Sequence, residues 1–169
     1  MKLIIAIVLA GFALCTCEWV HADQSDDAVR FFCGPGHDDL APLIRAESRH
    51  HLVRPSYLSA VMAAESHCQA DAMNVTTGAI GLFQIMPGRS ADPDHLDAGE
   101  LLDPETNVHL GARHLSELLT LCGSFAGAIH LNHSKDGHCR NWRTDKLVAE
   151  ILRRERAFWR WLRSQARVS

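Results

Sequence analysis

The chain has 169 residues, of which 47% are hydrophobic and 22% charged, and its formal net charge is −3. This length is enough for one compact core and short for two, and no internal repeat or low-complexity stretch is present. Because the net charge is small, the composition gives no indication of a nucleic-acid partner, and we expect none.

The N-terminus has the features of a signal peptide. Lys2 precedes an unbroken apolar run over residues 3–14, which has the length of a signal-peptide core and is too short to span a bilayer. Small or apolar residues at the two positions that signal peptidase reads place the cleavage after Ala22, so we expect export to the periplasm or secretion. The alternative is lipidation of Cys17, which Thr16 disfavours because it suits the preceding position poorly.

Cleavage leaves 147 residues, and we expect them to form one domain. Residues 23–37 show no apolar period and contain Gly34-Pro35-Gly36, which predicts an extended N-terminal segment. Residues 38–169 then form the domain itself, which ends in a basic helix.

Caps and prolines mark the boundaries of the expected helices. Pro55 stands where a helix-starting proline belongs, and Asp103-Pro104 combines an N-cap with a first-turn proline. Wherever apolar residues recur regularly, their spacing is that of a helix. No segment shows the alternation of apolar and polar residues that is typical of a strand, so the fold is expected to be all-α. The helices are expected at about residues 38–50, 55–67, 104–122 and 125–131, and from the cap Thr144 onward.

The last helix carries an excess of positive charge. From Arg140 onward there are nine Lys and Arg against three Asp and Glu, whereas residues 23–139 carry seven against sixteen. Such a helix can meet an anionic partner, for example phospholipid, the cell wall or a subunit of a secretion machine. A solvated helix face is the simpler interpretation, and we favour it.

Four cysteines remain after cleavage, namely Cys33, Cys68, Cys122 and Cys139. An even number in an exported chain indicates two disulfides. Three connectivities are possible, and the sequence alone does not settle among them. We favour Cys122–Cys139 across the short helix between them, which leaves Cys33–Cys68.

A carboxylate interrupts the apolar stripe of the helix at residues 55–67. Leu58 and Val61 mark the core-facing stripe, and Glu65 is the position on it seven residues after Leu58. A carboxyl group in apolar surroundings favours the protonated form, which a general acid needs. The alternative is a side chain that bends out to solvent or pairs with Arg89.

Residues 77–87 are a candidate ligand-binding segment. Two glycines, Gly78 and Gly81, lie within four residues and allow a ligand to approach the backbone closely. The amide of Gln84 can both donate and accept hydrogen bonds, as a carbohydrate site requires. The simpler interpretation is a loop whose glycines only make turns.

Three motifs follow one another over roughly residues 40–135: Glu65-Ser66, then residues 78–87, then Leu101-Leu102-Asp103-Pro104 with Asn107, Gly111 and Leu115. In this order and spacing they resemble the soluble lytic transglycosylase family, whose fold is similar to that of goose-type lysozyme. One short match is weak, whereas three in register are specific. The resemblance therefore implies an all-α, lysozyme-like domain.

The resemblance also implies a reaction and its residues. The chain would be a peptidoglycan lytic transglycosylase that needs no cofactor, with Glu65 catalytic and Gln84, Ser66 and Gly81 beside the glycan. In the family the Glu protonates the β-1,4 oxygen between N-acetylmuramic acid and N-acetylglucosamine. It then accepts a proton as the C6 hydroxyl attacks the anomeric carbon, which leaves a 1,6-anhydromuramoyl end. Asp71 is the nearest second acid, and we expect it at the surface.

A further family motif, Ala-Tyr-Asn-x-Gly, is altered in this chain. Residues 129–134 read Ile-His-Leu-Asn-His-Ser, so Asn132 matches and the Tyr is replaced by Leu, while the only Tyr of the chain is Tyr57, on an earlier helix. His130 and His133 can each donate to a carboxylate, so we expect one of them to replace the Tyr, with Asn132 also at the site. Impaired catalysis is the alternative.

Other functions compete with this hypothesis. His130, His133 and His138-Cys139 have a spacing suited to zinc, but an exported cysteine usually pairs with another cysteine, so we expect no metal there. A true lysozyme would use water in place of the C6 hydroxyl. A catalytically weak wall-binding component of a secretion, pilus or conjugation apparatus is a further candidate, and such a machine is a candidate partner besides peptidoglycan strands.

Overall fold

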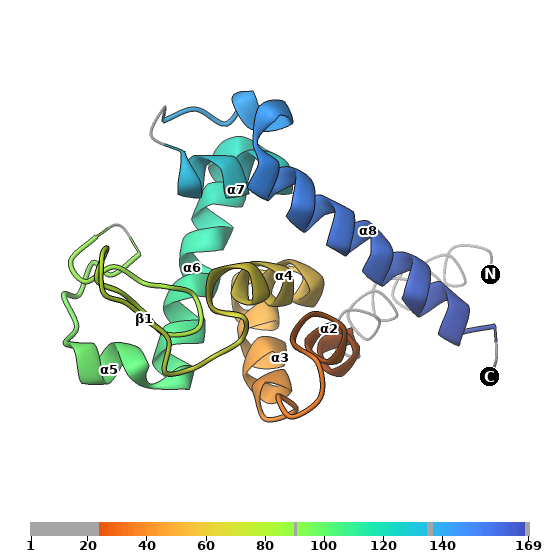
Figure 1. Ribbon diagram of the computed structural model, residues 1–169, viewed down its shortest axis with the longest axis horizontal. Helices are drawn as coiled ribbons and strands as arrows, with labels where there is room; N and C mark the ends of the chain where they lie inside the picture. The colour runs from red at the N-terminus through yellow and green to blue at the C-terminus, as the bar shows by residue number, and fades with distance from the viewer. Residues whose placement is uncertain (1–23, 90, 135–136, 168–169) are drawn as a thin grey trace, which may run out of the picture.

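Residues 24–89, 91–134 and 137–167 are described in the computed structural model, so the expected signal peptide and Cys17 lie outside the described residues. The described chain is mostly helical, with one small hairpin (Figure 1). No helix in these ranges is both long and apolar enough to cross a membrane. The elements are α2 (Gln24–Cys33), α3 (Leu40–His51), α4 (Pro55–Ser66), β1 (Met73–Asn74), β2 (Ala79–Ile80), α5 (Ala98–Leu102), α6 (Pro104–Cys122), α7 (Phe125–His133), the 3-10 helix η1 (Asn141–Thr144) and α8 (Lys146–Gln165).

Helix α4 forms the centre of the fold and packs against α2, α3, α6 and α8. Pro55 begins it, as the sequence predicts, and His67 ends it in the left-handed conformation. Leu58 and Met62 are fully buried, because neighbouring helices cover nearly every side of α4. The C-terminal half of α4, which carries Val61 and Glu65, reaches the cleft described below.

The expected extended segment at residues 23–37 is wrong, because residues 24–33 form helix α2. Ala28, Val29 and Phe32 form its buried face, and the ring of Phe32 lies 5.6 Å from that of Phe158 in α8. The face also includes the buried Ser25, so only three apolar residues mark its period, which is too few to recognise in the sequence. Helix α2 packs mainly against α4 and α3, with α8 adding aromatic contacts, and this tertiary packing stabilises it.

The small hairpin and helix α5 were also not expected from the sequence. Strands β1 and β2 pair antiparallel, with Met73 opposite Ile80, but two residues per strand are too few to show alternation. The turn between them is held by the Asn74 side chain, which accepts hydrogen bonds from the backbone of Thr76 and Thr77. Helix α5 has only five residues and begins with a capping box. The Asp97 side chain accepts from the backbone N–H of Glu100, and the Glu100 side chain accepts from the backbone N–H of Asp97.

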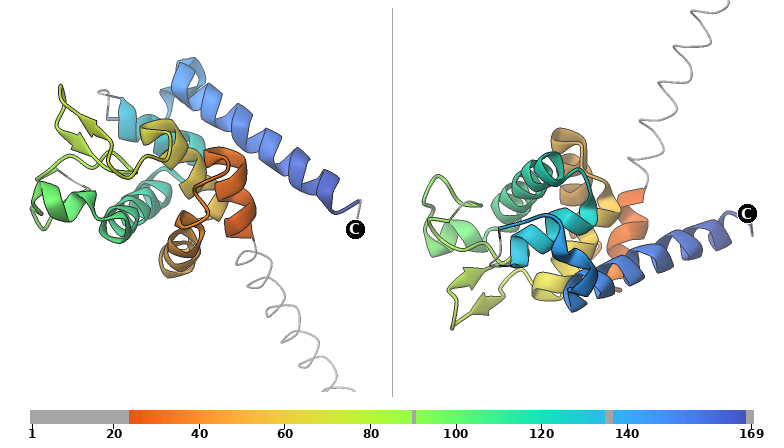
Figure 2. Two further views of the ribbon diagram at one scale, coloured as in Figure 1. Left: turned by 60° about the horizontal axis from the view of Figure 1, so that its bottom comes forward. Right: turned by 90° about the horizontal axis from the view of Figure 1, so that it is seen from above.

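Two disulfides join the pairs that the sequence favoured. Cys33–Cys68 ties α2 to the end of α4, and Cys122–Cys139 ties the end of α6 to the segment after α7. Helix α8 begins one residue later than expected, because Asp145 rather than Thr144 caps it. It crosses the other helices, and its C-terminal end projects beyond them (Figure 2).

Candidate active site

A cleft of about 530 Å³ lies where α4, the hairpin, α6 and α7 meet. Its walls are apolar where Phe83 and Leu115 face it and polar at one end. Because the polar side chains come from all four parts of the fold, tertiary packing alone brings them together. They are Glu65, Asn74, Thr77, Gln84, Arg89, His114, Asn132 and His133.

Glu65 lies in the last turn of α4, and its side chain is 15% exposed. Its Oε1 lies 3.1 Å from Nε2 of His133 and accepts a hydrogen bond of 3.4 Å from Nδ2 of Asn132. Both partners belong to α7. The alternative of a pair with Arg89 is therefore not what the structure shows, although Arg89 lines the same cleft.

His133 is the imidazole that contacts the catalytic candidate. Burial lowers the pKa of His133, but the hydrogen bond to Glu65 and the negative charges of Glu65 and Asp145 outweigh burial, so the pKa is raised above its usual value. The protonated imidazole is therefore more populated near neutral pH than in a free histidine. A carboxylate beside an imidazolium can share one proton with it.

Asn132 links Glu65 to a second histidine of the cleft, His114 of α6. Its Oδ1 lies 3.1 Å from Nε2 of His114, so this ring nitrogen donates to the amide. Burial lowers the pKa of His114, which its hydrogen bond to Asn132 and the nearby Glu117 only partly offset. His114 was not among the site residues predicted from the sequence. Its one local signal is its position three residues after Gly111, on the same side of the helix.

Gln84 holds the loop that forms one side of the cleft. Its backbone is left-handed, with φ of 48°, and its Nε2 donates to the carbonyls of Gly81 at 3.0 Å and Ala72 at 3.3 Å. These two hydrogen bonds use the amide nitrogen, so the carbonyl oxygen is the part of the amide suited to accept from a ligand. Gln84 therefore has a role in the loop in addition to the expected role at the glycan.

Gly81 has a packing role that differs from the expected contact with glycan. Its φ is 75°, and a Cβ at this position would lie 2.3 Å from Nδ2 of Asn107. Asn107 is fully buried; its Nδ2 donates to the carbonyls of Ile80 and Leu101, and its Oδ1 accepts from the backbone of Phe83. The loop is thus anchored on one buried amide.

Ser66 also supports the scaffold. It is 6% exposed, and its hydroxyl lies 2.8 Å from the carbonyl of Leu82, which ties the end of α4 to the loop. Gly111 has a similar supporting role, because a Cβ there would lie 2.2 Å from the ring of Phe83. These contacts explain why both residues occur in the motifs without assigning chemistry to them.

His130 lies away from Glu65, although the sequence placed it beside His133 as a candidate. It is 7% exposed, and its Nδ1 lies 2.9 Å from Oδ2 of Asp145. The hydrogen bond from His130 is the main reason that the pKa of Asp145 is lowered, and Asp145 in turn caps α8. Successive turns of α7 therefore direct the two imidazoles to different carboxylates.

The zinc cluster considered at residues 130–139 is not assembled. Cys139 is disulfide-bonded to Cys122, so it offers no thiolate, and His133 contacts Glu65. Asp71, the candidate second acid, is exposed in the turn after α4, as expected.

A second hollow, of about 410 Å³, adjoins the first and is lined in part by His67, Met73 and Val75. The two hollows share Glu65, Asn74 and Gln84. A long, chain-like ligand that lies through both would therefore pass the Glu65 carboxylate. Such an arrangement suits cleavage within a polymer rather than capture of a small molecule.

Known proteins resemble the chain in both sequence and fold. A sequence model of the family described as Transglycosylase SLT domain matches residues 42–146. The soluble lytic murein transglycosylase of Salmonella typhimurium is 32% identical over 100 residues, which are 53% of this chain and 15% of that protein. The protein of the same name from Escherichia coli K12 is 32% identical over 97 residues, again 15% of its length.

A solved structure is similar to this chain in fold. An inactive mutant of the lytic transglycosylase Slt from Pseudomonas aeruginosa superposes with a TM-score of 0.53 at 22% identity, covering 69% of this chain and 22% of that one. This likeness confirms the expected all-α, lysozyme-like fold.

Proposed function

We propose that this chain, which belongs to the transglycosylase SLT family, cleaves the β-1,4 bond between N-acetylmuramic acid and N-acetylglucosamine in peptidoglycan. The product would be a 1,6-anhydromuramoyl end. The observation that carries the proposal is the position of Glu65 at the junction of two hollows, in contact with an imidazole and an amide of α7. The names of the relatives, lytic murein transglycosylases, support it.

Glu65 performs both proton transfers in this reaction. It donates a proton to the glycosidic oxygen as the bond from that oxygen to the anomeric carbon breaks. The C6 hydroxyl oxygen of the same muramoyl residue then bonds to the anomeric carbon, and its proton goes to Glu65. No water is consumed, and the carboxyl group returns to its starting state.

His133 supports Glu65 by sharing its proton. Before substrate binds, the proton lies between Nε2 of His133 and Oε1 of Glu65, which are 3.1 Å apart. It moves to the carboxyl group as the glycosidic oxygen approaches and draws it away. His133 thus takes the place of the missing motif Tyr as the group beside the acid, while Leu131, at the Tyr position itself, packs against the core.

Asn132 and His114 would orient the carboxyl group. The amide of Asn132 donates to Glu65 and accepts from His114, which fixes the amide orientation. Because burial keeps the pKa of His114 low, this ring stays neutral and adds no positive charge next to the acid. The chain of contacts therefore positions Glu65 without competing for its proton.

The transglycosylase reaction is favoured over hydrolysis by the number of acids at the cleft. A hydrolase of the common type needs a second carboxylate to activate water or to act as nucleophile. Among the described residues that line the two hollows, Glu65 is the only carboxylate. An internal nucleophile, the substrate's own C6 hydroxyl, removes the need for a second one.

We also propose that the protein acts outside the cytoplasm, in the periplasm or after secretion. The two disulfides support this location, because such bonds form and persist in oxidising compartments. The substrate is found there as well. A secretion, pilus or conjugation machine as recruiting partner stays a prediction.

The product tests the proposed function. Purified protein with intact disulfides would be incubated with peptidoglycan sacculi, and the soluble fragments analysed by mass spectrometry. Muropeptides lighter by one water than the products of a lysozyme are expected, because the C6 hydroxyl closes the ring. Reducing ends would make the protein a hydrolase, and no released fragments at any pH between about 5 and 8 would refute glycan cleavage.

A further inference from the structure

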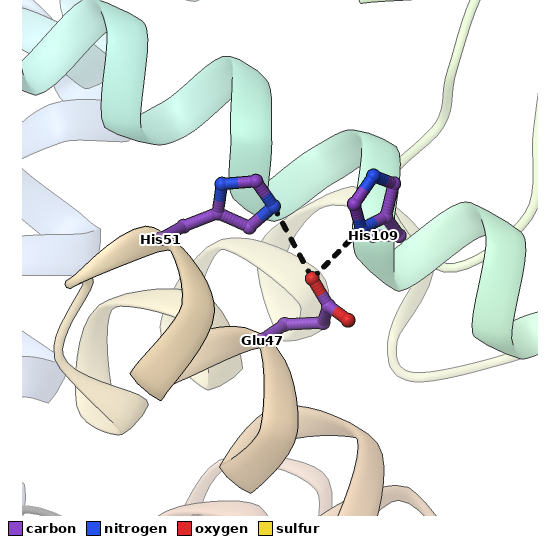
Figure 3. Close-up of side chains that lie close together, drawn as sticks. All are labelled: Glu47, His51 and His109. Atoms are coloured by element: carbon purple, nitrogen blue, oxygen red, sulfur yellow. Dashed lines mark hydrogen bonds and ion pairs between the residues drawn. The ribbon is translucent and has the colours of Figure 1, made fainter.

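A second group of titratable side chains lies outside the cleft, between α3 and α6 (Figure 3). Glu47 and His51 are four residues apart on α3, so they share one side of that helix. His109 of α6 faces them. Oε2 of Glu47 lies 3.2 Å from Nε2 of His51 and 2.9 Å from Nδ1 of His109, and the three atoms lie within 4.8 Å of one another.

We propose that Glu47, His51 and His109 bind a Zn²⁺ ion that links α3 to α6. Two imidazole nitrogens and one carboxylate oxygen are a ligand set that zinc takes in proteins, with a water as fourth ligand. A tetrahedron with metal–ligand bonds of about 2.1 Å has edges of about 3.4 Å. The distance from Glu47 to His51, 3.2 Å, is close to this edge, and the distance to His109, 2.9 Å, would lengthen when the ion binds. Nitrogen ligands make Ca²⁺ and Mg²⁺ unsuitable, because these ions take oxygen.

Hydrogen bonding alone leaves one atom of the group unsatisfied. Nε2 of His51 is buried and makes no hydrogen bond within the described residues, although Oε2 of Glu47 is only 3.2 Å away. The ring nitrogen and the carboxylate are thus close without being aligned for a shared proton. An ion placed between the three ligand atoms would satisfy all of them.

The three side chains of the proposed site differ in exposure. Glu47 and His51 are 17% and 12% exposed, whereas His109 is 42% exposed. Solvent can therefore reach the site past His109 and supply both the ion and the fourth ligand.

The position of the site suggests a structural role. His109 and His114 are five residues apart on α6, which turns them about 140° from each other around the helix axis. The ion would therefore hold one side of α6 while another side contributes His114 to the cleft. The hydroxyl of Ser116 already donates to the backbone carbonyl of His51, at 2.9 Å, so the ion would strengthen an existing contact between the two helices.

Cobalt titration tests the site in the untagged mature protein with both disulfides intact, after chelator treatment. Co²⁺ should give saturable visible absorption of tetrahedral intensity at one ion per chain, and Zn²⁺ should abolish this signal by displacement. Zn²⁺ should also raise the Tm. His109→Ala and Glu47→Gln should each weaken binding by more than about 100-fold, beyond the cost of losing a supporting residue.

Two control variants distinguish this site from other histidines. His50→Ala removes a neighbouring imidazole, 4.6 Å from the His51 ring, and should keep full binding. His133→Ala disrupts the cleft cluster and should also keep it. The proposal is overturned if wild type shows no saturable binding at one ion per chain, or if His109→Ala and Glu47→Gln bind as well as wild type. Equal loss in His133→Ala would place the ion in the cleft instead and would equally overturn it.

Discussion

Two groups in this protein combine histidine with glutamate, and their proton states differ. At the cleft, His133 lies between two negative side chains, and its pKa is raised. Between α3 and α6, burial lowers the pKa of His51, and the single carboxylate that it shares with His109 does not offset this effect. Burial lowers the pKa of both imidazoles, and only at the cleft do the neighbouring carboxylates outweigh it.

The largest effect is expected when the acid of the cleft group is removed. Glu65→Gln keeps the size of the side chain and its contact with Asn132 but has no transferable proton. Turnover on peptidoglycan should fall at least about 10³-fold, while binding to sacculi persists. Dye release from labelled sacculi and a pull-down assay measure the two properties. Asp71→Asn is the matched control and should cleave at the wild-type rate; a normal rate in Glu65→Gln would remove Glu65 from the mechanism.

Removal of the imidazole partner should have the next largest effect. His133→Ala should lower kcat on the order of 10²-fold, because the shared proton is lost. The pH profile gives a more specific test. The pKa of His133 is raised above 6.5, so wild-type activity should be present at lower pH and fall as pH rises through that raised pKa. This alkaline fall should be absent in His133→Ala, and an unchanged profile would show that His133 only fills space.

The pair of His133 and Glu65 should also stabilise the folded protein, and this contribution should likewise be larger at low pH than at high pH. A raised folded-state pKa means that the contribution of His133 to the free energy of unfolding is fully present below about pH 6.5 and is lost as pH rises through the raised pKa. Urea unfolding at several pH values measures it in wild type and in His133→Ala. The difference between the two proteins should shrink from low to high pH.

His130 provides a comparison within the same helix. His130→Ala should lower kcat by less than about 10-fold, because His130 contacts Asp145 and not Glu65. It should instead lower the free energy of unfolding by about 1–3 kcal/mol, since a half-buried carboxylate that caps α8 loses its partner. Equal rate losses in His130→Ala and His133→Ala would contradict the separation of roles seen in α7.

The smallest effect on cleavage is expected from metal removal. Chelator treatment of wild type should change the initial rate at 25 °C by less than about twofold, because no residue of the proposed zinc site lines the cleft. The same treatment should lower the Tm if zinc was bound. If chelator abolished cleavage and Zn²⁺ restored it, cleavage at the cleft would depend on the metal, which would contradict separate roles for the two groups.

Local signals in the sequence determined much of this protein. Prolines, caps and apolar periods predicted α3, α4, α6 and α7 to within a few residues, because these signals depend on neighbours in the chain. The same periodicity made Glu65 a candidate, since a carboxylate on an apolar stripe stands out within a single helix. The spacing of the motifs indicated the family, and the parity of the cysteines indicated two disulfides.

Tertiary structure decided the features that join distant segments. Helix α2 depends on packing against α4, α3 and α8. The contact of Glu65 with His133, while His130 contacts Asp145, depends on how α7 is rotated against α4. His114 enters the site only because α6 passes beside α7, and Glu47 meets His109 only because α3 packs on α6. None of these pairs has a local pattern, because each contact is set by the packing of two helices whose residues are far apart in the sequence.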